Sequence, residues 1–169
     1  EDLDFFYVQG SAVSTPLSKH PLHEALVAAV GKELDAAEIL HEQFGKPVII
    51  QTAYFSVKES WQGWEFYNLG SIPSESDSEN TWELHTPSER DQARVINAYF
   101  EAIEKRPWIT GYTQFGYWNY AMPELHDWSI RGKGAEEVWA RWNDAIKLMP
   151  LTNVTTTPAS MIEIEESEI

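Results

Sequence analysis

Uncharged polar and aromatic side chains stand directly after the apolar runs of the chain, where a ligand site can form. Gln9 comes near the end of the run that begins at Leu3, and Gln51 follows Val48-Ile49-Ile50. Amide groups donate and accept hydrogen bonds with a neutral polar ligand, and aromatic rings offer flat apolar surfaces to it. The pattern indicates a site for a neutral ligand, although the same rings could simply pack their loops onto the protein body. The residues predicted to contact the ligand are Gln9, Gln51, Tyr54, Trp61, Trp64, Tyr117 and Trp118.

Four carboxylates in the aromatic segments could reach the same site and act as a general acid and a general base. No two of them have a spacing that forces them together, so the sequence favours ordinary surface positions. These acids are Glu59, Glu65, Glu124 and Asp127.

Other catalytic arrangements lack support in the sequence. The chain has no cysteine, which excludes thiolate metal sites and cysteine nucleophiles. Its histidines never form the i, i+4 pair with an intervening Glu that binds zinc on a helix, and no serine stands in a Gly-x-Ser-x-Gly turn. We therefore predict neither a metal site nor a cofactor.

The composition restricts the partners of the chain. Nucleic acids and anionic membrane surfaces attract clustered Lys and Arg, so a chain with a net charge of −15 is predicted to bind neither. No apolar run approaches the roughly 18 residues that cross a bilayer, and no targeting pattern is present, which leaves the compartment open between secreted and cytoplasmic. A hydrophobic content of 43% indicates a packed domain, assigned to residues 1–150. The acidic tail at 151–169 is expected to be disordered.

Strand and helix patterns alternate along the predicted domain. Short runs rich in aromatic and β-branched residues predict strands, and apolar residues at helical spacing predict the helices between them. Thr86-Pro87-Ser88-Glu89 has the form of a capping box and predicts Thr86 as the N-cap of the second helix. The strands are expected at 4–10, 47–54 and 108–115, and the helices at about 22–44, 86–106 and 133–148.

The β-α-β-α-β-α order has connections too long for hairpins, so the strands should be parallel with the helices on their outer side. Three parallel strands cannot close a barrel, and they leave sheet edges exposed. We therefore expect either a missing N-terminal barrel half or self-association to complete the sheet. No glycine-rich phosphate loop supports the alternative of a doubly wound sheet.

Several sequence pieces between residues 3 and 147 resemble, in the same order, the C-terminal part of glycoside hydrolase family 113 and its clan A relatives. The resemblance implies an α/β fold that comprises strands six to eight of a (β/α)₈ TIM barrel. The pieces are Phe44-Gly45-Lys46-Pro47 with Val48-Ile49-Ile50 and Tyr54-Phe55-Ser56-Val57, Trp61-Gln62-Gly63-Trp64, 105–111 and 129–138.

The resemblance also implies a catalytic position. Retaining hydrolysis in that family uses an acid/base Glu at the end of strand four and a nucleophilic Glu at the end of strand seven, with carboxyl groups about 5 Å apart. On this resemblance Gln51 takes the nucleophile position and strand four lies outside the chain. An amide cannot attack an anomeric carbon, although it can bond to a sugar hydroxyl. The chain is thus expected to bind a β-mannan or β-glucan type saccharide without cleaving it alone, whether Gln51 is natural or engineered.

Three interpretations remain open from the sequence. The chain could be part of a glycoside hydrolase that a missing N-terminal half makes active. It could be a related barrel that binds carbohydrate, or scaffolds an assembly, without catalysis. It could also be an unrelated α/β domain whose aromatic loops meet a protein partner.

Overall fold

A three-stranded parallel sheet forms the backbone of the fold. A computed structural model of the chain describes residues 4–10, 13–63, 86–117 and 127–148. Strand β1 (Phe6–Gly10) pairs with β2 (Val48–Thr52), which pairs with β3 (Ile109–Gln114), and both pairings are parallel. The prediction of three parallel strands is confirmed, and each strand lies within its predicted range.

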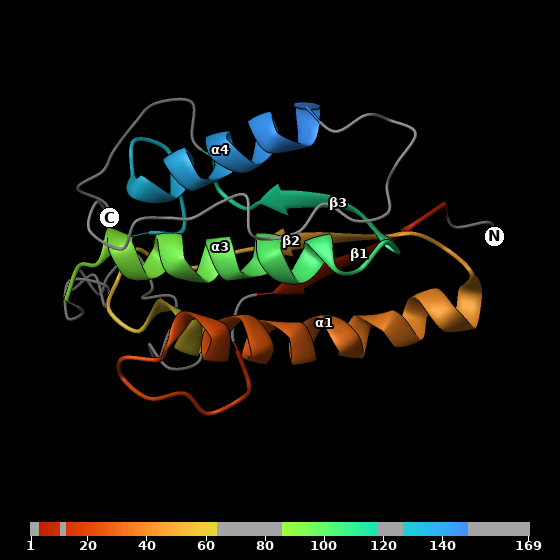
Figure 1. Ribbon diagram of the computed structural model, residues 1–169, viewed down its shortest axis with the longest axis horizontal. Coiled ribbons are helices and arrows are strands. Elements are labelled where there is room, and N and C mark those ends of the chain that lie inside the picture. The colour runs from red at the N-terminus through yellow and green to blue at the C-terminus, as the bar shows by residue number, and fades with distance from the viewer. Residues whose placement is uncertain (1–3, 11–12, 64–85, 118–126, 149–169) are drawn as a thin grey trace, which may run out of the picture.

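Three helices cover one face of this sheet. Helices α1 (His23–Phe44), α3 (Glu89–Glu104) and α4 (Gly134–Leu148) lie side by side, with α3 in the middle in contact with both neighbours (Figure 1). A short 3₁₀ turn, η1 (Ser60–Gln62), contacts α3. No helix in the described part of the chain is long and apolar enough to span a membrane.

The core lies between the helices and the sheet. Burial alternates along β2, so that Val48, Ile50 and Thr52 face the helices while Ile49 and Gln51 face the other side. The sequence predicts an apolar stripe of Ala93, Ile96, Phe100 and Ile103 on α3; the first three are buried, and Ile103 is partly buried against the core. The Phe100 ring is central to this core, because it packs edge-on against Tyr112 at 4.6 Å between ring centroids and stacks on Trp142 at 5.2 Å.

The start of α3 differs from the prediction. Thr86 and Pro87 do not belong to the helix, because they pair with the segment after β2: Lys58 N donates to Thr86 O at 2.9 Å, and Val57 forms a bridge with Pro87. Ser88 is the N-cap instead, and its side chain accepts a hydrogen bond from Asp91 N at 3.2 Å. Pairing with the segment after β2 therefore moves the N-cap by two residues, from the predicted Thr86 to Ser88.

Removing the Ser88 hydroxyl tests this assignment. Ser88→Ala is expected to lower the free energy of unfolding by about 1 kcal/mol, because the N–H of Asp91 loses its acceptor. Thr86→Ala is the matched control and is expected to cost less than about 0.5 kcal/mol. Urea unfolding followed by circular dichroism measures both, and a larger loss for Thr86→Ala would contradict Ser88 as the cap.

Candidate functional site

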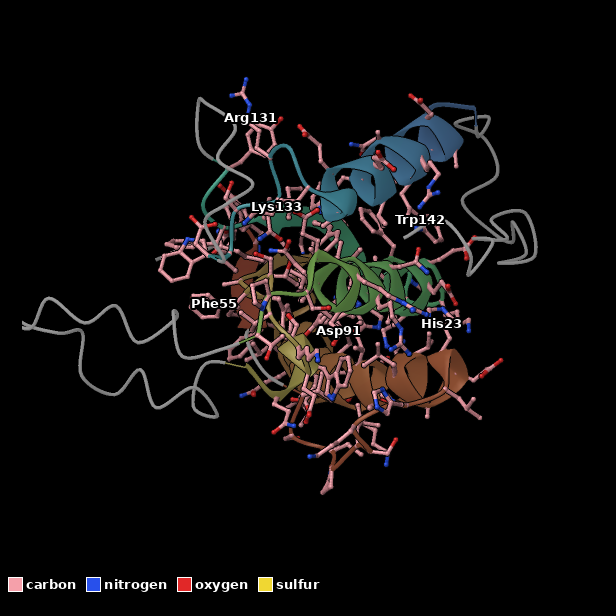
Figure 2. All side chains as sticks on the ribbon, turned by 90° about the vertical axis from the view of Figure 1, so that its left-hand side faces the viewer. His23, Phe55, Asp91, Arg131, Lys133 and Trp142 are labelled. Atoms are coloured by element: carbon pink, nitrogen blue, oxygen red, sulfur yellow. The ribbon has the colours of Figure 1, made fainter. Side chains whose placement is uncertain are left out.

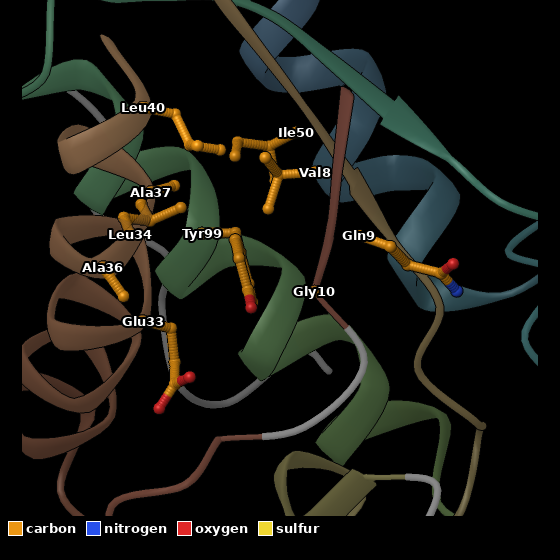
Figure 3. A pocket seen from close by; sticks show the side chains of 10 residues that line it. All are labelled: Val8, Gln9, Gly10, Glu33, Leu34, Ala36, Ala37, Leu40, Ile50 and Tyr99. Atoms are coloured by element: carbon orange, nitrogen blue, oxygen red, sulfur yellow. The ribbon is translucent and has the colours of Figure 1, made fainter. Parts of the chain in front are cut away.

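The face of the sheet that no described helix covers carries a row of uncharged polar side chains. The strand register places Gln9 beside Gln51 and Gln51 beside Thr113. Figure 3 shows the Gln9 side chain on the opposite side of β1 from Val8 and Tyr99, which face the helices. Neighbouring strands lie about 4.8 Å apart, so one small polar ligand can contact all three side chains at once. The sequence predicted Gln9 and Gln51, and the parallel pairing brings them together.

A hydrogen bond spans this face from β1 to β3. The Tyr7 hydroxyl and Thr113 Oγ1 lie 2.9 Å apart, and Tyr7 itself is 51% exposed. The sequence analysis missed both residues. The available signal was the two-residue period of strands, since Tyr7 precedes Gln9 by two positions and so shares its face.

Gln51 and Thr52 at the end of β2 point to opposite sides of the sheet. Thr52 is fully buried on the helix side, where its hydroxyl lies 2.9 Å from the Tyr112 hydroxyl and donates to Gln114 Oε1 at 2.8 Å. Gln51 is half-buried on the open face. Of these two neighbours, Gln51 is thus the one that can meet a ligand on that face.

Two of the predicted ligand-binding aromatic residues lie in the core. Tyr54 is 0% exposed, and its hydroxyl lies 3.0 Å from that of Tyr99; burial raises the pKa of Tyr54 and raises that of Tyr99 to about 12. Trp61 is 1% exposed, with the Arg94 guanidinium 5.6 Å from its ring centroid. Burial of this degree favours packing over ligand contact for Tyr54 and Trp61.

Tyr117 lies at the surface beyond the end of β3, but polar neighbours engage it. Its hydroxyl donates to Glu136 on α4, and the Arg131 guanidinium lies over its ring, 5.5 Å from the centroid. The backbone N–H of Gly132 also donates to Glu136, at 2.7 Å. The cation thus covers one face of the Tyr117 ring, and the side chain as a whole is 52% exposed. The predicted residues Trp64 and Trp118 lie outside the described residues.

The two described carboxylates that the sequence offered as a possible acid and base, Asp127 and Glu59, bind neighbouring side chains of the protein. Asp127 forms an ion pair with Lys133 at 2.9 Å, and the Lys133 side chain is fully buried (Figure 2). Lys133 Nζ also donates a hydrogen bond to Ser56 Oγ at 3.1 Å. Glu59 accepts a hydrogen bond from the Gln62 amide. Glu65 and Glu124 lie outside the described residues. Within the described ranges, no group of three His, Asp or Glu side chains could hold a metal ion.

The architecture is that of a portion of a (β/α) barrel, with parallel strands, helices on one face and polar residues on the other. Solved glycoside hydrolases share it. A GH113 β-1,4-mannanase in complex matches with a TM-score of 0.58 at 19% identity, over 85% of this chain and 40% of the mannanase. A β-glucuronidase of Bifidobacterium dentium, complexed with coumarin-3-O-glucuronide, matches with a TM-score of 0.50 at 19% identity, over 83% of this chain and 21% of the enzyme.

A β-glucuronidase of Faecalibacterium prausnitzii matches similarly, with a TM-score of 0.50 at 17% identity, over 84% of this chain and 22% of the enzyme. The chain therefore spans two fifths or less of each of these structures. No protein-family model and no curated protein sequence matches it. At these identities the likeness establishes the fold alone: three parallel strands and three helices that match part of a (β/α) barrel.

The buried Lys133 gives a stability prediction. Lys133→Met is expected to lower the free energy of unfolding by about 3 kcal/mol, because it leaves a largely buried Asp127 carboxylate without its cation. Adding Asp127→Asn should recover part of the loss, since the amide keeps an oxygen for the Ser129 N–H and carries no charge. Urea unfolding of the two variants checks this. Equal stability of the single and double variants would show that the unpaired charge is not the cause.

The Tyr117–Glu136 contact gives a pH prediction. The hydrogen bonds from Tyr117 and from Gly132 N–H hold the pKa of Glu136 below its ordinary value of 4.5. A lowered folded-state pKa contributes stability above the unfolded pKa, and that contribution is lost as the pH falls through the folded pKa. Tyr117→Phe should therefore move the Glu136 midpoint upward toward 4.5, measured by NMR titration of the side-chain carboxyl. Tyr7→Phe is the control, and an equal upward shift there would refute the local cause.

Proposed function

We propose that this chain is strands six to eight of a glycoside hydrolase-like barrel and that it binds a neutral saccharide on its open sheet face. Gln9, Gln51 and Thr113 contact the sugar hydroxyls from adjacent positions on three strands. The observation that carries the proposal is the register that aligns these side chains on the face without helices. Their amides and hydroxyl offer both donors and acceptors, as sugar hydroxyls require.

The ligand class follows from the charge of this face and from the related folds. Among the described residues, the row and its neighbours Tyr7 and Ile49 are uncharged, and the whole chain carries a net charge of −15. A neutral β-mannan or β-glucan type chain suits this surface better than an anionic ligand, which the overall field repels. The mannanase match supports the choice of sugar, since that enzyme acts on a β-1,4-mannan, as its name states.

Binding does not lead to cleavage by this chain alone. Retaining hydrolysis needs a nucleophilic carboxylate and a second carboxyl about 5 Å away. Gln51, at the proposed nucleophile position, is an amide, and the strand that would carry the acid/base lies in the N-terminal half of a barrel. Completion of the barrel by that half, or by self-association, supplies the remaining wall of the site. A scaffolding role without sugar binding is the second candidate, favoured by the deep burial of Tyr54 and Trp61.

Titration with mannohexaose and cellohexaose tests the proposal, with isothermal calorimetry as the measurement. Gln51→Ala is expected to weaken binding by about tenfold, because a hydrogen bond worth about 1 kcal/mol is lost and its partner is left unpaired. Gln43→Ala removes an exposed amide from α1 and is the matched control. The proposed site would be overturned if the chain bound neither of the two saccharides. It would also be overturned if Gln51→Ala and Gln43→Ala weakened binding equally.

A further variant tests catalysis. Gln51→Glu introduces a carboxylate at the proposed nucleophile position but adds no acid/base, so we expect it to release no reducing sugar from mannan or β-glucan. Turnover by the unsubstituted chain would show that the catalytic groups lie elsewhere.

A further inference from the structure

The Tyr7 side chain lies across the middle strand of the open sheet face. Tyr7 belongs to β1, and its hydroxyl is 2.9 Å from Thr113 Oγ1 on β3. In the sheet order β1-β2-β3, strand β2 separates the two residues, and two strand spacings amount to about 10 Å. The Tyr7 side chain can bridge this distance only by extending over β2. The hydrogen bond at its far end then fixes the ring in that position.

The strand register explains how β2 leaves room for this ring. Tyr7 is level with Ile49, and a shift in the pairing of β2 with β3 sets Gly111 rather than Thr110 opposite Ile49. A Cβ atom at Gly111 would lie 3.2 Å from Ile49 Cγ1 and 3.3 Å from Ile49 Cγ2. The Ile49 side chain therefore fills the space over the glycine on the β3 side. The side of β2 that is nearer to β1 is left to the Tyr7 ring.

The outer face of the Tyr7 ring is accessible. The residue is 51% exposed although its hydroxyl is hydrogen-bonded, whereas Tyr54 and Tyr99 on the helix side are at most 1% exposed. The hydroxyl end of Tyr7 lies against Thr113, and one side of its ring faces β2. The exposed part is therefore the ring face that is turned away from the sheet. It forms a flat apolar surface that is held at both ends.

The row of amides borders this flat surface. Gln9 follows Tyr7 by two residues, and Gln51 follows Ile49 by two, so both amides share the open face and lie about 7 Å further along their strands. A pyranose ring carries C–H bonds on its faces and most of its hydroxyls around its edge. The negative face of an aromatic ring attracts the slightly positive hydrogens of such C–H bonds. A sugar can thus stack on Tyr7 while its edge hydroxyls reach Gln9 and Gln51.

We propose that Tyr7 is the stacking platform of the saccharide site. One pyranose ring lies flat on the exposed face of Tyr7, Gln9 and Gln51 bond to hydroxyls at its edge, and Thr113 holds the far end of the platform. In a β-mannosyl unit the face with H1, H3 and H5 carries no axial oxygen, so this face lies on Tyr7. The inference rests on the proposed sugar site and names the residue that orients the sugar in it.

Calorimetric titration with mannohexaose tests the platform through three variants. Tyr7→Leu keeps an apolar side chain but removes the ring, and it is expected to weaken binding at least about tenfold. Tyr7→Phe keeps the ring and loses only the hydroxyl, so it is expected to bind within about threefold of the original chain. Phe44→Leu is the matched control, because Phe44 is 52% exposed on α1, outside the open face, and its ring should not matter for binding.

Proton NMR of mannohexaose separates stacking from a structural role of Tyr7. Protons that lie over the face of an aromatic ring shift upfield. The H1, H3 and H5 signals of one mannosyl unit should therefore move upfield on saturation with the original chain and with Tyr7→Phe, but not with Tyr7→Leu. Gln51→Ala should keep the upfield shift at saturation although its affinity is lower, because the amide contributes a hydrogen bond and no ring.

The outcomes distinguish the platform from the sugar site itself. Binding by Tyr7→Leu that equals binding by the original chain would overturn the platform, and so would the lack of an upfield shift in an original chain that binds the saccharide. In both cases weaker binding by Gln51→Ala would leave the proposed function intact. Absence of saccharide binding by the original chain would overturn both. If circular dichroism shows that Tyr7→Leu does not fold, the upfield shifts with the original chain and with Tyr7→Phe decide.

Discussion

Parallel pairing of β2 with β1 and with β3 is the constraint on which the rest of this structure depends. Each return to a parallel neighbour needs a crossover long enough for a helix, and all three helices lie on the same face. Because parallel strands end at one edge, the register also brings Gln9, Gln51 and Thr113 into one row. The same strand pairing therefore determines both the burial pattern on the helix side and the candidate site on the open side of the sheet.

Helix α3 converts this arrangement into a core. It contacts α1 on one side and α4 on the other, and its buried residues meet the helix-facing side of the sheet. Several large rings pack in this core: Tyr99 stacks on Tyr112, and Phe100 lies against Tyr112 and Trp142. Aromatic residues bury more area than any other type, so a domain with an open sheet face gains much of its stability from them. A high aromatic content is accordingly weak evidence for a binding surface.

Charged groups near the ends of the strands serve the same structural purpose. Asp127 and Lys133 hold the segment before α4 against the residues that follow β2, and Glu136 fixes Tyr117. These acids are neutralised or hydrogen-bonded by neighbours in the chain. The open face is left with amides and hydroxyls, whose hydrogen bonds with a neutral ligand carry a smaller desolvation cost than those of ions.

The sequence by itself determined the order of elements, because hydrophobic period and turn residues are local: the three strands and the three helices between and after them all follow from neighbouring residues. It also identified Gln9 and Gln51 as strand-end amides. Only the tertiary structure decided that Ser88 rather than Thr86 caps α3, that Tyr54 and Trp61 are buried, and that Tyr7 and Thr113 join across β2. Each of these depends on a contact between residues far apart in the chain, and a local pattern contains no information about which distant group will meet it.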